Sequence, residues 1–192
     1  QKTEAGKFTE DKQDSVWTSW FENGQKKDEG AFKKGFMNGK WTGWFDNGNK
    51  NYDGTYADSV KTGEWQYFFK NGKLYQKGNY KKGKQDGYWL YYFGTGILES
   101  VGNFENGARD GKWFFYYETG VKYREENHKF GKLSGEIKMW YPDAKIQCVG
   151  RYALSRPNEK AEWISVKNGE WIFYDHKGTV IRKETYKGGA KQ

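Results

Sequence analysis

Residues 63–83 read Gly-Glu-Trp-Gln-Tyr-Phe-Phe-Lys-Asn-Gly-Lys-Leu-Tyr-Gln-Lys-Gly-Asn-Tyr-Lys-Lys-Gly, and they contain one complete β-hairpin pattern. An aromatic segment precedes Asn71-Gly72, and a more polar segment with a central glycine follows it. Asn-Gly between two strand-like segments is the strongest short-range hairpin signal, because glycine adopts the positive φ that a tight turn requires. The polar residues 81–86 then predict a short return turn into the next strand.

The same pattern recurs along the chain with a period of 24 residues. Its clearest marker is Gly-x-Trp, which starts at Gly39, Gly63, Gly87 and Gly111, with variant copies at Ser15 and Gly135. The next copy, at Gly169, follows after one period plus ten residues. The segment 6–8 matches the second half of a further copy. The sequence thus predicts a half repeat or cap in 1–14, six repeats in 15–152, an insertion loop in 153–168, and a last repeat with a C-terminal cap in 169–192.

A glycine column and aromatic columns keep the same register and suggest how the repeats pack. The second strand of each copy has a central glycine, for example Gly54 or Gly78, whose missing side chain leaves room for a neighbouring ring. We expect that ring to lie flat against the backbone, and removal of a central Trp to cost about 3–5 kcal/mol. Alternation places aromatic residues on both faces of the first strand. The predicted fold is all-β: an elongated, single-layer antiparallel meander of about seven repeated β-hairpins.

Composition excludes several classes of protein. The chain has 192 residues, a formal net charge of +8 and 20% aromatic residues, but few aliphatic ones, as a layer without a deep core would have. Its longest apolar runs, 88–93 and 113–117, are too short for a transmembrane helix. The single cysteine permits no internal disulfide and no cysteine-based zinc site. The first residue is Gln1 rather than Met, from which we expect a processed product. No cofactor is predicted.

The full motif resembles that of a known family. Read over residues 63–83, the pattern Gly-x-Trp-x-x-aromatic-aromatic-x-Asn-Gly-x5-Gly-x-aromatic-x-x-Gly is similar to MORN repeats, closest to the bacterial variant form, some members of which are described as antitoxin components. The resemblance extends over about residues 6–189. It implies β-hairpin arrays that serve as scaffolds or partner-binding surfaces, or that associate with membrane lipids. The departures, such as Glu126, His128 and Ile137, lie in the last three copies, where we expect a specialised role.

The sequence offers little for catalysis. His128 occupies an aromatic column and is interpreted as a substituted structural ring, while His176 lies in a hairpin turn. Cys148 is interpreted as a structural thiol. Glu125 and Glu126 are adjacent in a strand and therefore point to opposite faces, so they cannot act as an acid–base pair. We predict that the protein is not an enzyme.

Lysines recur in the second strands and the return turns, for example in 26–27, 33–34 and 81–84. Acidic residues such as Asp28, Asp53 and Asp86 lie among them, which argues against nucleic-acid binding. The simplest interpretation of these lysines is a solvated surface that discourages edge-to-edge aggregation. Attraction to an anionic lipid surface or to a wall polymer stays an alternative.

Two features predict a binding role. One aromatic face of a single sheet can remain exposed, and we take Trp140, Tyr116 and Tyr92 as its candidate residues. Insertions in repeat arrays often lie on the binding face, and Arg156, Lys160 and Trp163 are the candidates in 153–168. We predict a binding or scaffold protein that recognises a protein partner through these residues. The alternative is a cell-surface or periplasmic module for wall glycan or anionic lipid, and the bacterial periplasm, outer surface or a secreted state is favoured over the cytoplasm.

Overall fold

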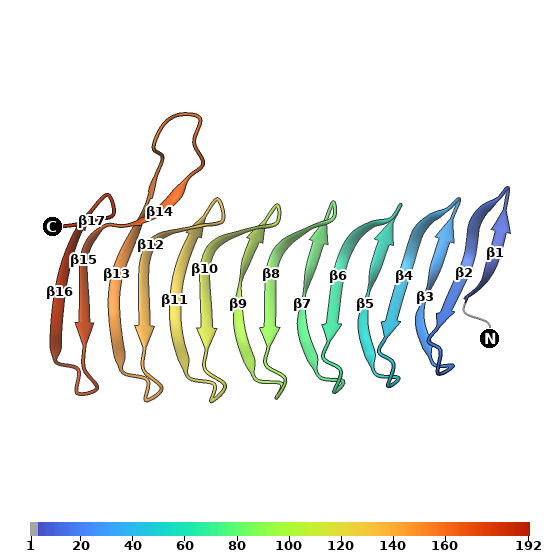
Figure 1. Cartoon of the computed structure of the whole chain (residues 1–192), viewed down its shortest axis with the longest axis horizontal. Helices are drawn as coiled ribbons and strands as arrows, with labels where there is room; N and C mark the ends of the chain where they lie inside the picture. Colours follow the sequence, from blue (N-terminus) through green and yellow to red (C-terminus); the bar gives the residue numbers. More distant parts are fainter. Residues whose placement is uncertain (1–3) are drawn as a thin grey trace. The chain divides into compact units, whose positions relative to one another are not determined.

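The computed structural model describes residues 4–192, so the first three residues of the predicted N-terminal cap lie outside the described part. The described chain is all-β and its strands pair antiparallel with their neighbours (Figure 1). It contains no helix that is long and apolar enough to cross a membrane. Two compact units divide the chain: the first unit is Gln1–Gly96 and the second unit is Ile97–Gln192.

The first unit is a meander in which each strand pairs with the next, and Figure 1 shows no second layer on it. Its strands are β1 (Glu4–Thr9), β2 (Lys12–Trp20), β3 (Lys26–Lys33), β4 (Phe36–Trp44), β5 (Lys50–Ala57), β6 (Val60–Phe68), β7 (Leu74–Lys81) and β8 (Lys84–Tyr92).

The second unit is built in the same way. Its strands are β9 (Leu98–Glu105), β10 (Ala108–Tyr116), β11 (Lys122–Lys129), β12 (Lys132–Trp140), β13 (Ile146–Ser155), β14 (Ile164–Lys167), β15 (Gly169–Tyr174), β16 (Val180–Lys187) and β17 (Ala190–Lys191). The predicted meander of repeated hairpins is therefore confirmed.

The inserted residues form a hairpin rather than a plain loop. β13 continues to Ser155 and pairs with β14, from Tyr152 opposite Lys167 to Ser155 opposite Ile164. Of the inserted residues, 156–163 and Asn168 lack strand structure. This insertion hairpin, residues 153–167, projects beyond the ends of the neighbouring strands (Figure 1). Further down, β13 pairs with β15, so the meander resumes after the insertion.

Each repeat is held to the next by a tryptophan that lies against a glycine. A Cβ built on Gly54 would lie 2.1 Å from the ring of Trp65, and one on Gly78 would lie 2.4 Å from the ring of Trp89. The tryptophans are buried; Trp65, Trp89 and Trp113 are at most 1% exposed. This is the predicted packing, and we call it the Trp–Gly lock. It recurs in the pairs Gly6/Trp17, Gly30/Trp41, Gly102/Trp113 and Gly150/Trp171.

A β-bulge supports each lock. In β7–β8 the register shifts between Gly78 and Asn79, which removes the Asn79 carbonyl from the regular ladder. The indole Nε1 of Trp89 donates a hydrogen bond of 3.0 Å to that oxygen. Gly87, two residues before the Trp, has φ +76°, a conformation that favours glycine. The Gly-x-Trp motif thus combines a strained bulge position with the ring that satisfies the displaced carbonyl.

Between β11 and β12, where the sequence departs from the motif, charged groups replace the Trp–Gly lock. Glu126 stands in the glycine position and faces Ile137, which replaces the tryptophan. Glu126 is 2% exposed, and its carboxylate lies 2.8 Å from His128 Nε2 and 3.0 Å from Arg124 Nε. The smaller Ile137 leaves room for the larger Glu126, so the two departures compensate each other.

The two faces of the sheet carry different side chains. We call the face with the tryptophan and glycine columns the Trp face. In the second unit Trp113 and Phe115 lie on it with ring centroids 6.0 Å apart, and Phe114 lies on the opposite face beside Lys122. Both faces therefore carry rings, as alternation predicted.

Candidate functional site

The predicted site residues fall into separate places. Arg156, Lys160 and Trp163 lie in the tip of the insertion hairpin. Tyr116 and Trp140 end β10 and β12 and share one column on the face opposite the Trp face. That column lies at the opposite end of the strands from the insertion hairpin (Figure 1). The strands are about 25 Å long. Tyr92 ends β8 and belongs to the first unit.

One ring of the predicted aromatic column, that of Trp140, already has a partner within the protein. Lys122 Nζ lies 4.4 Å from the Trp140 ring and 5.3 Å from the Phe114 ring. Lys122 also forms an ion pair of 2.9 Å with Glu125 on the same face. Tyr116 and Trp140 are half-buried rather than fully exposed. Through Lys122, Trp140 therefore takes part in joining neighbouring hairpins.

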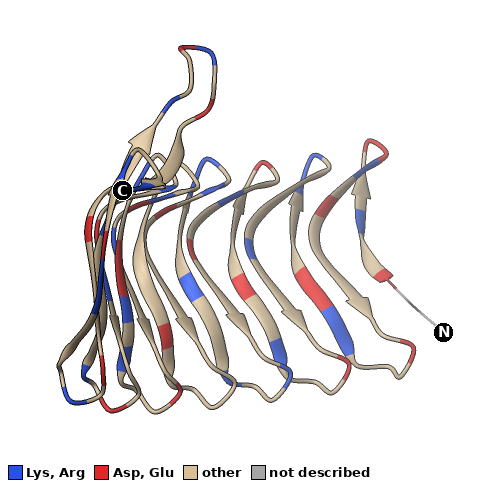
Figure 2. Cartoon of the chain, turned by 60° about the vertical axis from the view of Figure 1, so that its left-hand side comes forward, with Lys and Arg blue, Asp and Glu red and all other residues tan. Residues whose placement is uncertain are grey.

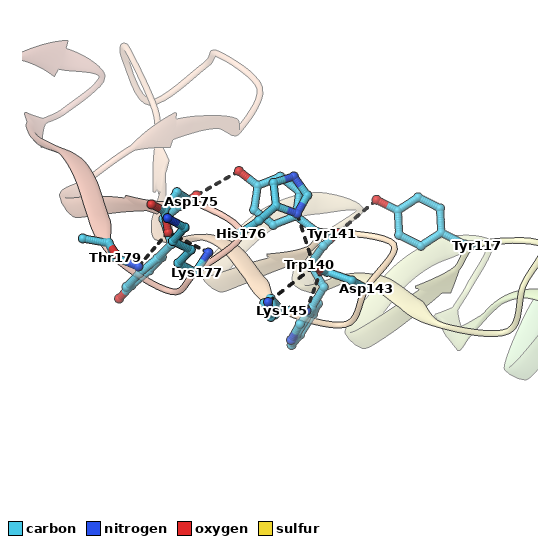
Figure 3. A network of polar contacts seen from close by, with 10 residues as sticks. Tyr117, Trp140, Tyr141, Asp143, Lys145, Asp175, His176, Lys177 and Thr179 are labelled. Carbon is cyan, nitrogen blue, oxygen red and sulfur yellow. Dashed lines mark hydrogen bonds and ion pairs between the residues drawn. The ribbon is translucent and has the colours of Figure 1, made fainter.

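The hairpin turns near this column form a second set of ties. The Tyr117 hydroxyl donates to the Trp140 carbonyl at 3.0 Å, and the Tyr141 hydroxyl donates to the Tyr174 carbonyl at 2.8 Å (Figure 3). His176 stacks on Tyr141 with ring centroids 3.8 Å apart, and its Nδ1 lies 3.3 Å from an Asp143 oxygen. His176 thus joins two successive turns, which is a structural role.

A residue that the sequence interpretation did not select stands out beside the insertion. Phe130 lies in the return turn between β11 and β12 with φ +53°, and it is 61% exposed. The same turn position is occupied by Lys34, Lys82 and Asn106, at φ between 51° and 52°. A bulky side chain in this conformation costs about 1 kcal/mol, which polar turn residues such as Asn incur less. The sequence signal that could have identified Phe130 is an aromatic residue in a column of otherwise polar turn residues.

Phe130 meets the insertion hairpin. Its ring stacks on Trp163 with centroids 6.5 Å apart and an interplanar angle of 24°. The Arg156 guanidinium lies 5.5 Å from the centre of the Trp163 ring, and Arg156 Nε donates to the Ala161 carbonyl at 2.8 Å. Trp163 is 37% exposed. We call Phe130, Trp163 and Arg156 the hairpin patch.

Basic residues surround the hairpin patch. Lys129 Nζ lies 5.4 Å from the Phe130 ring, and Lys132 Nζ lies 3.9 Å from the carboxylate of Glu162. The insertion hairpin itself carries both positive and negative segments (Figure 2). The turn at Phe130 and the insertion hairpin together carry Lys129, Lys132, Arg156 and Lys160 against Glu159 and Glu162, which is a local excess of positive charge.

The candidates for catalysis have structural partners. Cys148 is 3% exposed among apolar side chains of the second unit, and burial raises the pKa of its thiol. His128 pairs with Glu126 and packs edge-on against Trp113. Over residues 4–192, no group of three or more His, Cys, Asp or Glu side chains is placed to hold a metal ion.

Comparison with known proteins identifies four of the repeats. No curated protein matches the chain. The family model described as MORN repeat variant matches residues 37–58, 61–82, 109–130 and 167–187. Each matched segment contains a Trp of the Trp–Gly lock, at 41, 65, 113 and 171. Four of the repeats in the chain therefore match the MORN repeat variant.

Proposed function

We propose that this protein is a non-enzymatic binding module, in which the repeats form a scaffold that presents the hairpin patch to a protein partner. The observation that carries the proposal is Phe130: it is exposed, it has a strained backbone conformation, and it stacks on a ring of the insertion. Other copies hold Lys34, Lys82 and Asn106 in the same turn conformation, so the exposed aromatic ring is what distinguishes this turn. MORN repeats in general support a binding or scaffold role.

The chemistry of the patch suits a protein interface. Trp and Arg are enriched among the residues that dominate binding energy, and here Arg156 lies over Trp163. Phe130 extends the apolar surface beside them. A protruding hairpin on a rigid sheet is also a common place for recognition, because the scaffold fixes its position while the tip stays accessible.

Substitution of the patch tests the proposal. Phe130→Asn removes the ring and installs the residue found at the equivalent turn position, Asn106, so the fold should be retained. Phe130→Asn and Trp163→Ala should each reduce partner capture about tenfold or more, measured by quantitative pull-down with the full chain. Tyr88→Asn is the matched control, because Tyr88 is 69% exposed in the first unit. Unchanged capture by both folded patch variants would contradict the proposal.

An alternative function follows from the positive charge around the rings. Lys129, Lys132 and Lys160 beside Phe130 and Trp163 suit an anionic membrane surface or an anionic wall polymer. Sedimentation with phosphatidylserine vesicles and with cell-wall material tests it. Salt-sensitive binding that is lost in Lys129→Glu and Lys160→Glu would favour this function over a protein partner.

We further propose a location in the periplasm, on the outer surface or outside the cell. A surface module would meet wall glycan or anionic lipid directly, whereas a cytoplasmic scaffold would not. Fractionation of cells that express the full gene product tests this, and recovery in the cytoplasm alone would contradict it.

A further inference from the structure

Three tryptophans of the Trp face are covered by a cation from the protein itself. Lys61 Nζ lies 4.3 Å from the Trp65 ring, Arg109 Cζ lies 4.2 Å from the Trp113 ring, and Lys167 Nζ lies 4.3 Å from the Trp171 ring. Each cation stands four residues before its tryptophan. Cations at this distance over an indole are attracted by the electron-rich face of the ring. The repeat therefore contains a position where a basic side chain binds on a tryptophan.

In the first two copies this position holds Gln13 and Met37 instead. Within residues 4–192, no Lys or Arg lies over the ring of Trp17 or Trp41. A cavity of about 280 Å³ opens on the Trp face at this place. Its lining includes Gln13, Trp17, Phe32, Trp41, Asp28 and Tyr52.

The cavity exists because two columns carry small residues here. Ser19 and Gly43 stand two residues after their tryptophans, where the third copy has Tyr67 stacked on Trp65. Gly43 also admits the Tyr52 ring, since a Cβ on Gly43 would lie 2.2 Å from Tyr52 Cε1. The small residues Ser19 and Gly43 thus leave room for the cavity, and the Tyr52 ring forms part of its lining.

A carboxylate is held in position in this cavity. The Tyr52 hydroxyl donates to Asp28 Oδ1 at 2.7 Å, and the Ser19 hydroxyl donates to Asp28 Oδ2 at 3.2 Å. Glu4 also lines the cavity. In the described part of the chain neither acid forms an ion pair. The cavity therefore combines rings and negative charge without a cation of its own.

We propose that this cavity binds the side chain of a Lys or Arg from a protein partner. The basic group would lie over Trp17 and Trp41 and pair with Asp28, as Lys61, Arg109 and Lys167 lie over tryptophans in their own copies. This site is in the first unit and does not depend on the hairpin patch of the second unit. The choice of a basic side chain rests on the three internal cations and on the complementary charge of the cavity.

The direct test uses short peptides as probes. Each indole Nε1–H group gives a separate NMR signal. The Nε1–H of Trp41 donates to the Ala31 carbonyl at 3.0 Å, and the Nε1–H of Trp17 donates to the Asp14 carbonyl at 3.2 Å. Capped Gly-Arg-Gly and Gly-Lys-Gly should shift these two signals and leave that of Trp89 unchanged. Versions with citrulline or norleucine should shift neither. Equal shifts with the charged and the neutral peptides would overturn the proposal. Binding of free guanidinium as strong as that of Gly-Arg-Gly would also overturn it, because the site would then bind a small cation instead of a side chain.

Two variants locate the site. Asp28→Asn keeps an acceptor for Tyr52 but removes the charge, and it should weaken peptide binding about tenfold. Gln13→Lys places the protein's own cation in the position that Lys61 has in its copy, and it should abolish peptide binding while the fold is retained. Gln85→Lys is the matched control, because Gln85 holds the same column position before Trp89, outside the cavity. Wild-type binding by folded Asp28→Asn and Gln13→Lys would overturn the proposal.

Discussion

At the scale of single residues, the structure depends on close approach between tryptophan rings and backbone. The Trp89 indole lies where a side chain on Gly78 would be, and its Nε1 satisfies the carbonyl of Asn79. The glycine and tryptophan columns made this contact predictable, because both follow one 24-residue register. Phe130 was not predictable in the same way, since its stacking on Trp163 depends on the path of an insertion that has no repeat to define it.

The Trp–Gly lock can be tested with one methyl group. Gly78→Ala would place a Cβ 2.4 Å from the Trp89 ring, and the strand backbone has little room to move. We expect a loss of about 2–3 kcal/mol in the free energy of unfolding, measured by urea denaturation. Gly94→Ala is the control, because no atom lies within 4 Å of its added Cβ, and it should change stability by less than about 0.5 kcal/mol. Equal effects would contradict the lock.

At the scale of elements, neighbouring hairpins are tied by different groups in the two units. In the first unit turn asparagines reach the next turn, as Asn47 Nδ2 does to the Lys70 carbonyl at 2.8 Å. In the second unit the hydroxyls of Tyr117 and Tyr141 do so (Figure 3). The turn Asn column and the Phe or Tyr column are both visible in the sequence. Their link is not, because the hydrogen bonds by which Tyr takes over from the lost Asn cross the repeat boundary.

The variant lock between β11 and β12 predicts strong coupling. Ile137→Trp alone would place a large ring against Glu126, and Glu126→Gly alone would leave Arg124 and His128 without their carboxylate. Each single change should cost about 2 kcal/mol or more. The double change restores the Trp–Gly pair, so its cost should be lower than the sum by about 2 kcal/mol, measured in a double-mutant cycle. Additive costs would show that the two departures are independent.

At the scale of the whole molecule, the composition follows from the architecture. A single layer has no deep core for aliphatic side chains, so rings packed on glycines supply the burial, and the chain has 38 aromatic residues (10 Trp, 15 Tyr and 13 Phe) with 26 glycines. In such an array each repeat contacts its neighbours, and stability is a sum of local terms. The predicted meander and its repeat count could be derived from the sequence alone, whereas its division into two compact units could not, because the period continues through 96 and 97.

Local stability should be visible at the one thiol of the chain. Cys148 is buried in the second unit and should react with iodoacetamide only when that region opens. Gly54→Ala and Gly102→Ala create matched clashes, at 2.1 Å with Trp65 and at 2.2 Å with Trp113, in the first and the second unit respectively. Because coupling is between neighbours, Gly102→Ala should lower the urea concentration at which Cys148 becomes labelled, and Gly54→Ala should change it much less. An equal decrease in both variants would instead mean that the whole chain unfolds as one cooperative unit.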